Sequence, residues 1–146
     1  MNKADTLLYQ NEWHKLREFL LQTNGWLKNE IKTFMNQFDI TQQQYNILLI
    51  LQDAKGEPLS TNKICEQMID KMSDSSRIVD RLISKGLAKK NPCPHDGRKI
   101  QVFITPEGEY LLSTISTKLK NLDAIFNKLT NDEAVQLNHL LEKLRS

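Results

Sequence analysis

The segment from Arg77 to Lys99 concentrates positive charge that could bind a polyanion. It contains seven Lys or Arg residues and two acidic residues, whereas the formal net charge of all 146 residues is only +2. The rest of the chain is therefore net acidic. A basic patch on one segment is typical of a nucleic-acid site. The alternative is an ordinary solvated surface, and charge alone does not decide between the two.

Inside this segment the stretch 91–100 reads NPCPHDGRKI and lies between two short strand-like runs. Its turn-forming residues are Pro92, Pro94, Asp96 and Gly97. Proline fixes one backbone torsion and Asp-Gly favours a tight turn, so the sequence predicts a projecting hairpin. Arg98 would lie near its tip, where a guanidinium can enter a DNA minor groove. His95 and Lys99 flank Arg98 and are expected to contact phosphates.

The start of the predicted helix SDSSRIVDRLISKG is a second candidate for contacting DNA. Ser73 is a good N-cap, and Asp74 suits the positive end of the helix dipole or could read cytosine. A helix in the major groove contacts DNA mainly through its N-terminal residues. The candidate contacts here are Ser73, Ser75, Ser76 and Arg77. Arg77 could pair bidentately with guanine, whereas for Arg81 we expect an intrachain ion pair with Asp96.

Residues before this helix are candidates for holding the phosphate backbone. Ser60, Thr61 and Lys63 open a short predicted helix, where hydroxyls and helix N–H groups can bind phosphate. Lys71 lies in the following turn. Lys89 and Lys90 are either further phosphate contacts or solvated lysines of a strand end.

Apolar spacing, capping residues and glycines define the elements that would position these side chains. Thr41 with Gln44 and Thr130 with Glu133 are capping-box pairs, and Thr105-Pro106 begins another helix. A heptad-like apolar seam from Leu111 to Leu129 predicts one long helix there. The expected helices are 12–36, one from Thr41, one from Ser60, 73–86, 106–129 and one from Thr130, with strands at 87–91 and 99–105.

Composition restricts the class of protein. A hydrophobic fraction of 39% and a charged fraction of 26% are typical of a globular domain. No apolar run approaches the roughly 20 residues that span a bilayer, and no signal-peptide pattern opens the chain, so we expect a cytoplasmic protein with no membrane partner. Cys65 is expected in the core. No phosphate loop, nucleophile elbow or metal-ligand spacing is present in the sequence, so we expect neither an enzyme nor a bound cofactor or metal.

This order of elements predicts a mainly α fold: a winged helix-turn-helix with a two-stranded β wing and long N- and C-terminal helices. The stretch SSRIVDRLISKGLAKKNPCPHDGRKIQVFITPEG closely resembles the recognition helix, wing and following helix of MarR-type transcription regulators. The shared features are a VDRL..KGL helix end, a D-x-R wing tip and an ITPEG exit. Arg98 matches the wing arginine that reaches into the minor groove in that family.

The resemblance implies a homodimer that binds palindromic double-stranded DNA, usually as a repressor. It implies one domain, 1–146, with a DNA-binding region at 41–105 and helical dimerisation regions at 1–40 and 106–146. The apolar seam from Leu111 and the apolar last helix favour the same conclusion, because a small winged domain cannot cover them. The alternative is a winged-helix adaptor that binds proteins and no DNA.

Regulators of this family often respond to small aromatic anions or to oxidants. Trp13, His14 and Trp26 are candidate residues for binding an aromatic effector, although aromatic rings at helical spacing are also ordinary core residues. Cys93 lies in an electropositive stretch and is expected to be exposed on the wing. The family's oxidant sensors carry their cysteine near the start of the first helix, where this chain has none, and this argues against redox sensing.

Overall fold

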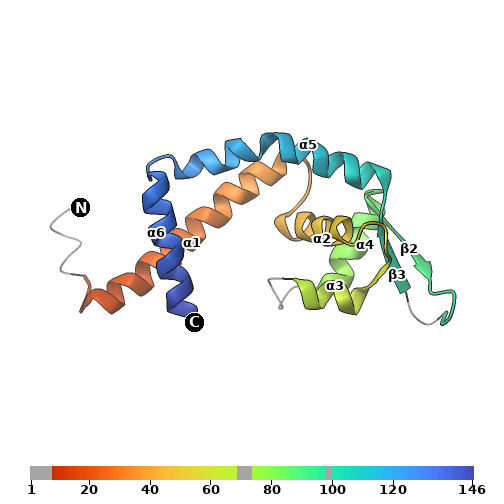
Figure 1. Ribbon diagram of the computed structural model, residues 1–146, viewed down its shortest axis with the longest axis horizontal. Helices are drawn as coiled ribbons and strands as arrows, with labels where there is room; N and C mark the ends of the chain where they lie inside the picture. The colour runs from red at the N-terminus through yellow and green to blue at the C-terminus, as the bar shows by residue number, and fades with distance from the viewer. Residues whose placement is uncertain (1–7, 69–73, 98–99) are drawn as a thin grey trace.

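The computed structural model describes residues 8–68, 74–97 and 100–146. It forms a small winged lobe joined to a helical arm, with the C-terminus at the end of the arm away from the lobe (Figure 1). The elements are α1 Glu12–Asn36, α2 Gln42–Asp53, β1 Leu59–Ser60, α3 Thr61–Gln67, α4 Ser75–Ser84, β2 Ala88–Pro92, β3 Ile100–Ile104, α5 Pro106–Asp123, the short 3-10 helix η2 Ala124–Phe126 and α6 Asn131–Arg145.

The lobe is built from α2, α3, α4 and the sheet around one apolar cluster. Ile47, Leu48 and Leu51 of α2 meet Ile64 of α3 and Leu82 of α4 in that cluster, and all five are at most 2% exposed. Each helix supplies residues from one face only, as its three- and four-residue spacing predicts. The opposite faces of α3 and α4 are therefore available to a ligand.

The sheet is antiparallel and has the strand order β1-β3-β2. β2 and β3 pair from Ala88 with Ile104 to Pro92 with Ile100, which confirms the predicted wing. The two-stranded prediction was incomplete, because β1 also pairs with β3 through Leu59 and Val102. Two residues carry no periodic signal of their own, so only this pairing reveals the strand.

The arm consists of α1, α5, η2 and α6. A second cluster of Phe34, Met35, Ile40 and Ile115 joins the end of α1 to α5 near the lobe. Tyr45 of α2 packs against both clusters, and burial raises the pKa of its phenol. The arm and the lobe therefore share a packed junction.

Helix limits follow the capping residues. Thr41 and Gln44 form a capping box at α2, Thr130 and Glu133 form one at α6, and Thr105 caps α5. The predicted single helix 106–129 was wrong at its end: α5 stops at Asp123 and a 3-10 turn follows. The capping box at Thr130 starts a new helix, so the chain has to leave the helical path before it.

No helix within the described residues is long and apolar enough to cross a membrane.

Candidate nucleic-acid interface

α4 is the element that presents the predicted base-contacting residues. Its N-cap is Asp74, whose side chain accepts a hydrogen bond from the backbone N–H of Arg77 at 3.3 Å. The prediction that Ser73 caps this helix was wrong by one position, and Ser73 lies outside the described residues. Gly86, with a φ of 73°, follows the last turn and ends the helix as predicted.

The two faces of α4 separate its roles. Val79 and Leu82 are buried in the core, whereas Ser76 and Arg77 are exposed at the first turn. Ser75 was predicted to contact DNA, but its side chain faces the core and is 5% exposed. Its Oγ has no hydrogen-bond partner among the described residues. Ser75 is therefore not accessible to DNA, whereas Ser76 and Arg77 are.

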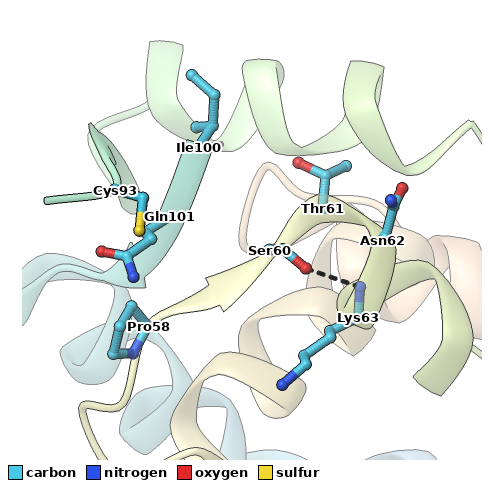
Figure 2. A pocket seen from close by; sticks show the side chains of 8 residues that line it. All are labelled: Pro58, Ser60, Thr61, Asn62, Lys63, Cys93, Ile100 and Gln101. Atoms are coloured by element: carbon cyan, nitrogen blue, oxygen red, sulfur yellow. Dashed lines mark hydrogen bonds between the residues drawn. The ribbon is translucent and has the colours of Figure 1, made fainter. Parts of the chain in front are cut away.

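The start of α3 lies next to the wing. Ser60 caps α3 by accepting a hydrogen bond from the backbone N–H of Lys63 at 3.2 Å. Thr61 and Lys63 then line a pocket of about 490 Å³ between α3 and the strands. Figure 2 shows Cys93 and Gln101 on the strand side of this pocket, opposite the residues of α3. The predicted set Ser60, Thr61 and Lys63 is therefore together on one surface.

The structure also adds two pocket-lining residues that sequence reasoning missed, Asn62 and Gln101. Asn62 is adjacent to the predicted set and is exposed. Gln101 reaches the pocket only because β3 pairs with β1, in the register of Gln101 with Ser60. No local sequence signal could have placed Gln101 there.

The wing is attached to α4 by an ion pair. Nζ of Lys90 lies 3.4 Å from a carboxylate oxygen of Asp80. We expected Arg81 to pair with Asp96, but Arg81 is exposed and forms no ion pair with another described residue. On the same strand as Lys90, Lys89 lies over the ring of Phe103, with its Nζ 5.7 Å from the ring centroid.

Several predicted contacts are not placed by the structure. Lys71, Arg98 and Lys99 lie outside the described residues, as Ser73 does. His95 is described and exposed, on the stretch that leads to the wing tip.

Both cysteines differ from their predicted surroundings. Cys65 is only half-buried, although its neighbour Ile64 is fully buried in the core. Cys93 was expected to be exposed on the wing, but it is half-buried and lines the pocket next to α3. The strand pairing that brings β3 to β1 also brings Cys93 toward α3, so its burial is a tertiary effect.

The three residues predicted to bind an aromatic effector lie against different neighbours along α1. Trp13 is 78% exposed on α1. His14 faces Tyr9 edge to face, with 5.7 Å between ring centroids. Trp26 lies further along α1 against Phe126 of η2, with 6.1 Å between ring centroids. These three residues therefore have different neighbours within one chain, and the aromatic-effector site stays a prediction.

A contact that the sequence did not indicate joins α4 to the turn between α1 and α2. Lys85, the C-cap of α4, donates a hydrogen bond to the backbone carbonyl of Asp39, and its Nζ lies 3.4 Å from the Asp39 carboxylate. Asp39 has a φ of 55°, a left-handed conformation that Asp tolerates better than most residues. The end of α4 is thereby fixed to the junction with the arm.

Comparison with known proteins agrees with this geometry. Residues 38–99 match the profile of the MarR family. The HTH-type transcriptional regulator PrsX from Escherichia coli is 24% identical over 157 residues, covering 99% of this chain and 95% of PrsX. The HTH-type transcriptional repressor IacR from Pseudomonas putida is 29% identical over 125 residues, covering 85% of this chain and 74% of IacR.

A solved structure of a MarR mutant from Escherichia coli, complexed with operator DNA, has the same fold. It superposes with a TM-score of 0.78 at 24% sequence identity, covering 92% of this chain and 96% of that chain. The matched profile spans α2 to β2 and ends just before β3, so it includes α3 and α4 of the candidate interface. The chain is therefore similar to MarR-family regulators in the sequence of residues 38–99, and it shares the fold of the MarR mutant along most of its length.

Proposed function

We propose that this protein is a transcription regulator that binds double-stranded DNA, with α4 in the major groove and the β2–β3 wing at the adjacent minor groove. The observation that carries the proposal is the exposed first turn of α4, with Ser76 and Arg77, on a lobe whose other α4 face is buried. α3 lies on the side of the lobe away from α5, and β2 and β3 run from the start of α5 toward that side (Figure 1). The same lobe therefore presents a helix, a second helix start and a hairpin to a duplex.

The fold of the MarR mutant complexed with operator DNA supports this mode of binding. IacR is named a transcriptional repressor, and we propose repression for this chain as well. A protein bound across a promoter excludes other proteins from it, so repression requires no further surface. The operator of this chain is proposed to be palindromic, as a two-fold symmetric protein requires.

We propose that the regulator is a homodimer because the arm carries an apolar stripe that its own chain covers only in part. The stripe on α1 runs through Trp13, Leu16, Leu20, Ile31 and Phe34 at helical spacing. Phe34 is 5% exposed, whereas Trp13 is 78% exposed and Leu16 is 41% exposed. An apolar stripe that is buried at one end and open at the other is what a partner helix would cover.

α6 also has an apolar face that its own chain leaves exposed. None of its residues is buried, although Leu137, Leu140, Leu141 and Leu144 share one face. Leu144 lines a groove together with Trp13, Leu16 and Leu20 of α1, so the two open surfaces adjoin. A second copy of the arm would cover both, and this places two winged lobes in one molecule.

The direct test is binding of a labelled random-sequence duplex, followed by fluorescence anisotropy at two salt concentrations. We expect binding that weakens with salt, with a log–log slope of about 0.9 for each phosphate contact. Absence of binding even at low salt would contradict the proposal and favour a protein-binding adaptor. Sedimentation of the same sample gives the number of protomers bound to each duplex.

A further inference from the structure

Asp74 contacts the arginine that we place against DNA bases, in addition to capping α4. One carboxylate oxygen, Oδ1, accepts the backbone N–H of Arg77 at 3.3 Å. The other, Oδ2, lies 3.7 Å from Nε of the Arg77 guanidinium. The first contact fixes the carboxylate relative to the helix, and the second places it at the Nε edge of the guanidinium.

This arrangement leaves the reading edge of the guanidinium available. A guanidinium is planar and carries five N–H donors, one on Nε and four on the two Nη atoms. Bidentate recognition of guanine uses parallel N–H groups directed at O6 and N7. Since Asp74 lies at the Nε edge, the two Nη groups remain for a base. The side chains of Arg77 and Asp74 are 81% and 63% exposed, so a duplex can reach both.

We propose that Asp74 is a positioning residue for sequence recognition: it orients the Arg77 guanidinium so that its Nη groups present a fixed fork to guanine. The proposal rests on the proposed function, because it requires α4 to enter the major groove. An exposed ion pair contributes little to folding stability. Its effect appears on binding, where a preoriented arginine loses less rotational freedom than an unrestrained one.

A carboxylate in this place also has a general electrostatic effect, and the two effects differ in sign. Negative charge at the start of α4 repels phosphates and weakens binding to every sequence. Orientation of Arg77 strengthens binding only to a duplex with guanine at the contacted position. Orientation of Arg77 therefore raises the ratio of the affinity for a duplex with guanine at the contacted position to the affinity for a duplex without it. A charge effect that changes both affinities by the same factor leaves this ratio unchanged.

The experiment measures dissociation constants for two duplexes at one salt concentration. One is the duplex that the wild-type protein enriches most from a random pool, and the other is a shuffled duplex of the same length and composition. The variants are Asp74→Asn, Asp74→Ser, Arg77→Ala and the double variant Asp74→Asn with Arg77→Ala. Asn and Ser preserve an N-cap while removing the charge, so thermal unfolding of α4 variants should match that of the wild type.

The matched control is Asp53→Asn. Asp53 is an exposed carboxylate at the end of α2 in the same lobe, and it forms no ion pair with another described residue. The substitution changes net charge by the same amount as Asp74→Asn. We expect Asp53→Asn to leave the ratio of the two affinities unchanged.

We expect Asp74→Asn to lower the ratio of the two affinities about 5- to 20-fold, within the discrimination that one bidentate contact supplies. The double variant should discriminate no less than Arg77→Ala alone, because Asp74 acts through Arg77. Substituting single base pairs should show that Asp74→Asn and Arg77→Ala relax the same G·C position.

Two results would overturn the inference. Asp74→Asn could strengthen binding to both duplexes equally, which would leave general repulsion as its whole effect. Alternatively, the losses from Asp74→Asn and Arg77→Ala could multiply in the double variant, which would make Asp74 an independent base reader. A wild-type protein that enriches no duplex is a different outcome, because it contradicts the proposed function itself.

Discussion

At the scale of single residues, adjacent serines at the start of α4 have opposite roles. Ser75 is buried with an Oγ that has no hydrogen-bond partner among the described residues, whereas Ser76 is exposed. The sequence could not separate them, because both are small polar residues at a helix start. Their difference follows from the packing of α4 on the lobe.

We expect Ser75→Ala to raise the free energy of unfolding by up to about 1 kcal/mol, because alanine removes a buried hydroxyl that lacks a partner. DNA affinity should not change. Ser76→Ala is the matched variant, and it should weaken DNA binding slightly without changing stability. Denaturant titration and anisotropy of both variants check this. Weaker DNA binding by Ser75→Ala than by Ser76→Ala would contradict the assignment.

At the scale of elements, the start of α5 is fixed to the lobe by a close backbone approach at Gly108. A Cβ built on Gly108 would meet the backbone oxygen of Leu87 and would lie 2.8 Å from Cγ1 of Ile104. Thr105, the N-cap, also donates a hydrogen bond from Oγ1 to the carbonyl of Gly86 at 2.7 Å. These contacts set the angle between α5 and the end of α4.

We predict that Gly108→Ala lowers the free energy of unfolding by about 2–3 kcal/mol, since an added methyl group would force the backbone of Leu87 to move. Gly25→Ala is the comparison in α1, where an added Cβ meets nothing within 4 Å. It should raise stability by about 0.5–1 kcal/mol through helix propensity. Both values come from chemical denaturation at one protein concentration. Equal effects of the two substitutions would show that α5 does not pack on Leu87 as described.

Much of the element order could be predicted from local patterns. The apolar spacing of α1 and the capping boxes at Thr41 and Thr130 gave limits that agree with the structure. β1 and the half-burial of Cys93 depend on pairing between distant segments. Local spacing contains no information on such pairing, so these features could not be predicted.

The candidate site was predictable to a similar extent. Helix-start and hairpin signals placed Ser60, Thr61 and Arg77 on accessible helix starts, as the structure has them. The prediction of Ser73 as the N-cap was wrong by one position, because the next residue, Asp74, is of a type that caps equally well. The Asp74–Arg77 ion pair depends on side-chain positions that no local sequence pattern specifies.

At the scale of the whole molecule, the open apolar surfaces of α1 and α6 lie at the end of the arm away from the winged lobe. On one face of α6, Leu140 is 52% exposed and Leu144 is 57% exposed. His139 lies on the other side of the same helix. Because the arm is separate from the lobe, the proposed dimer surface and the proposed DNA-contacting surface do not overlap.

We expect Leu140→Asp to raise the dimer dissociation constant by more than about tenfold, because a charged group would be buried at the interface. His139→Asp adds the same side chain on the opposite face, and it should leave the dimer intact. Sedimentation equilibrium measures both. A wild-type protein that is monomeric at micromolar concentration would contradict the homodimer directly.

The central claim is that two winged lobes of one symmetric molecule read a duplex together. Selection of bound sequences from a random duplex pool by the wild-type protein tests it most directly. The account predicts a palindrome whose half-site centres lie about one helical turn, or roughly 10 base pairs, apart. Enrichment of a single unrepeated motif, or no enrichment at all, would contradict it.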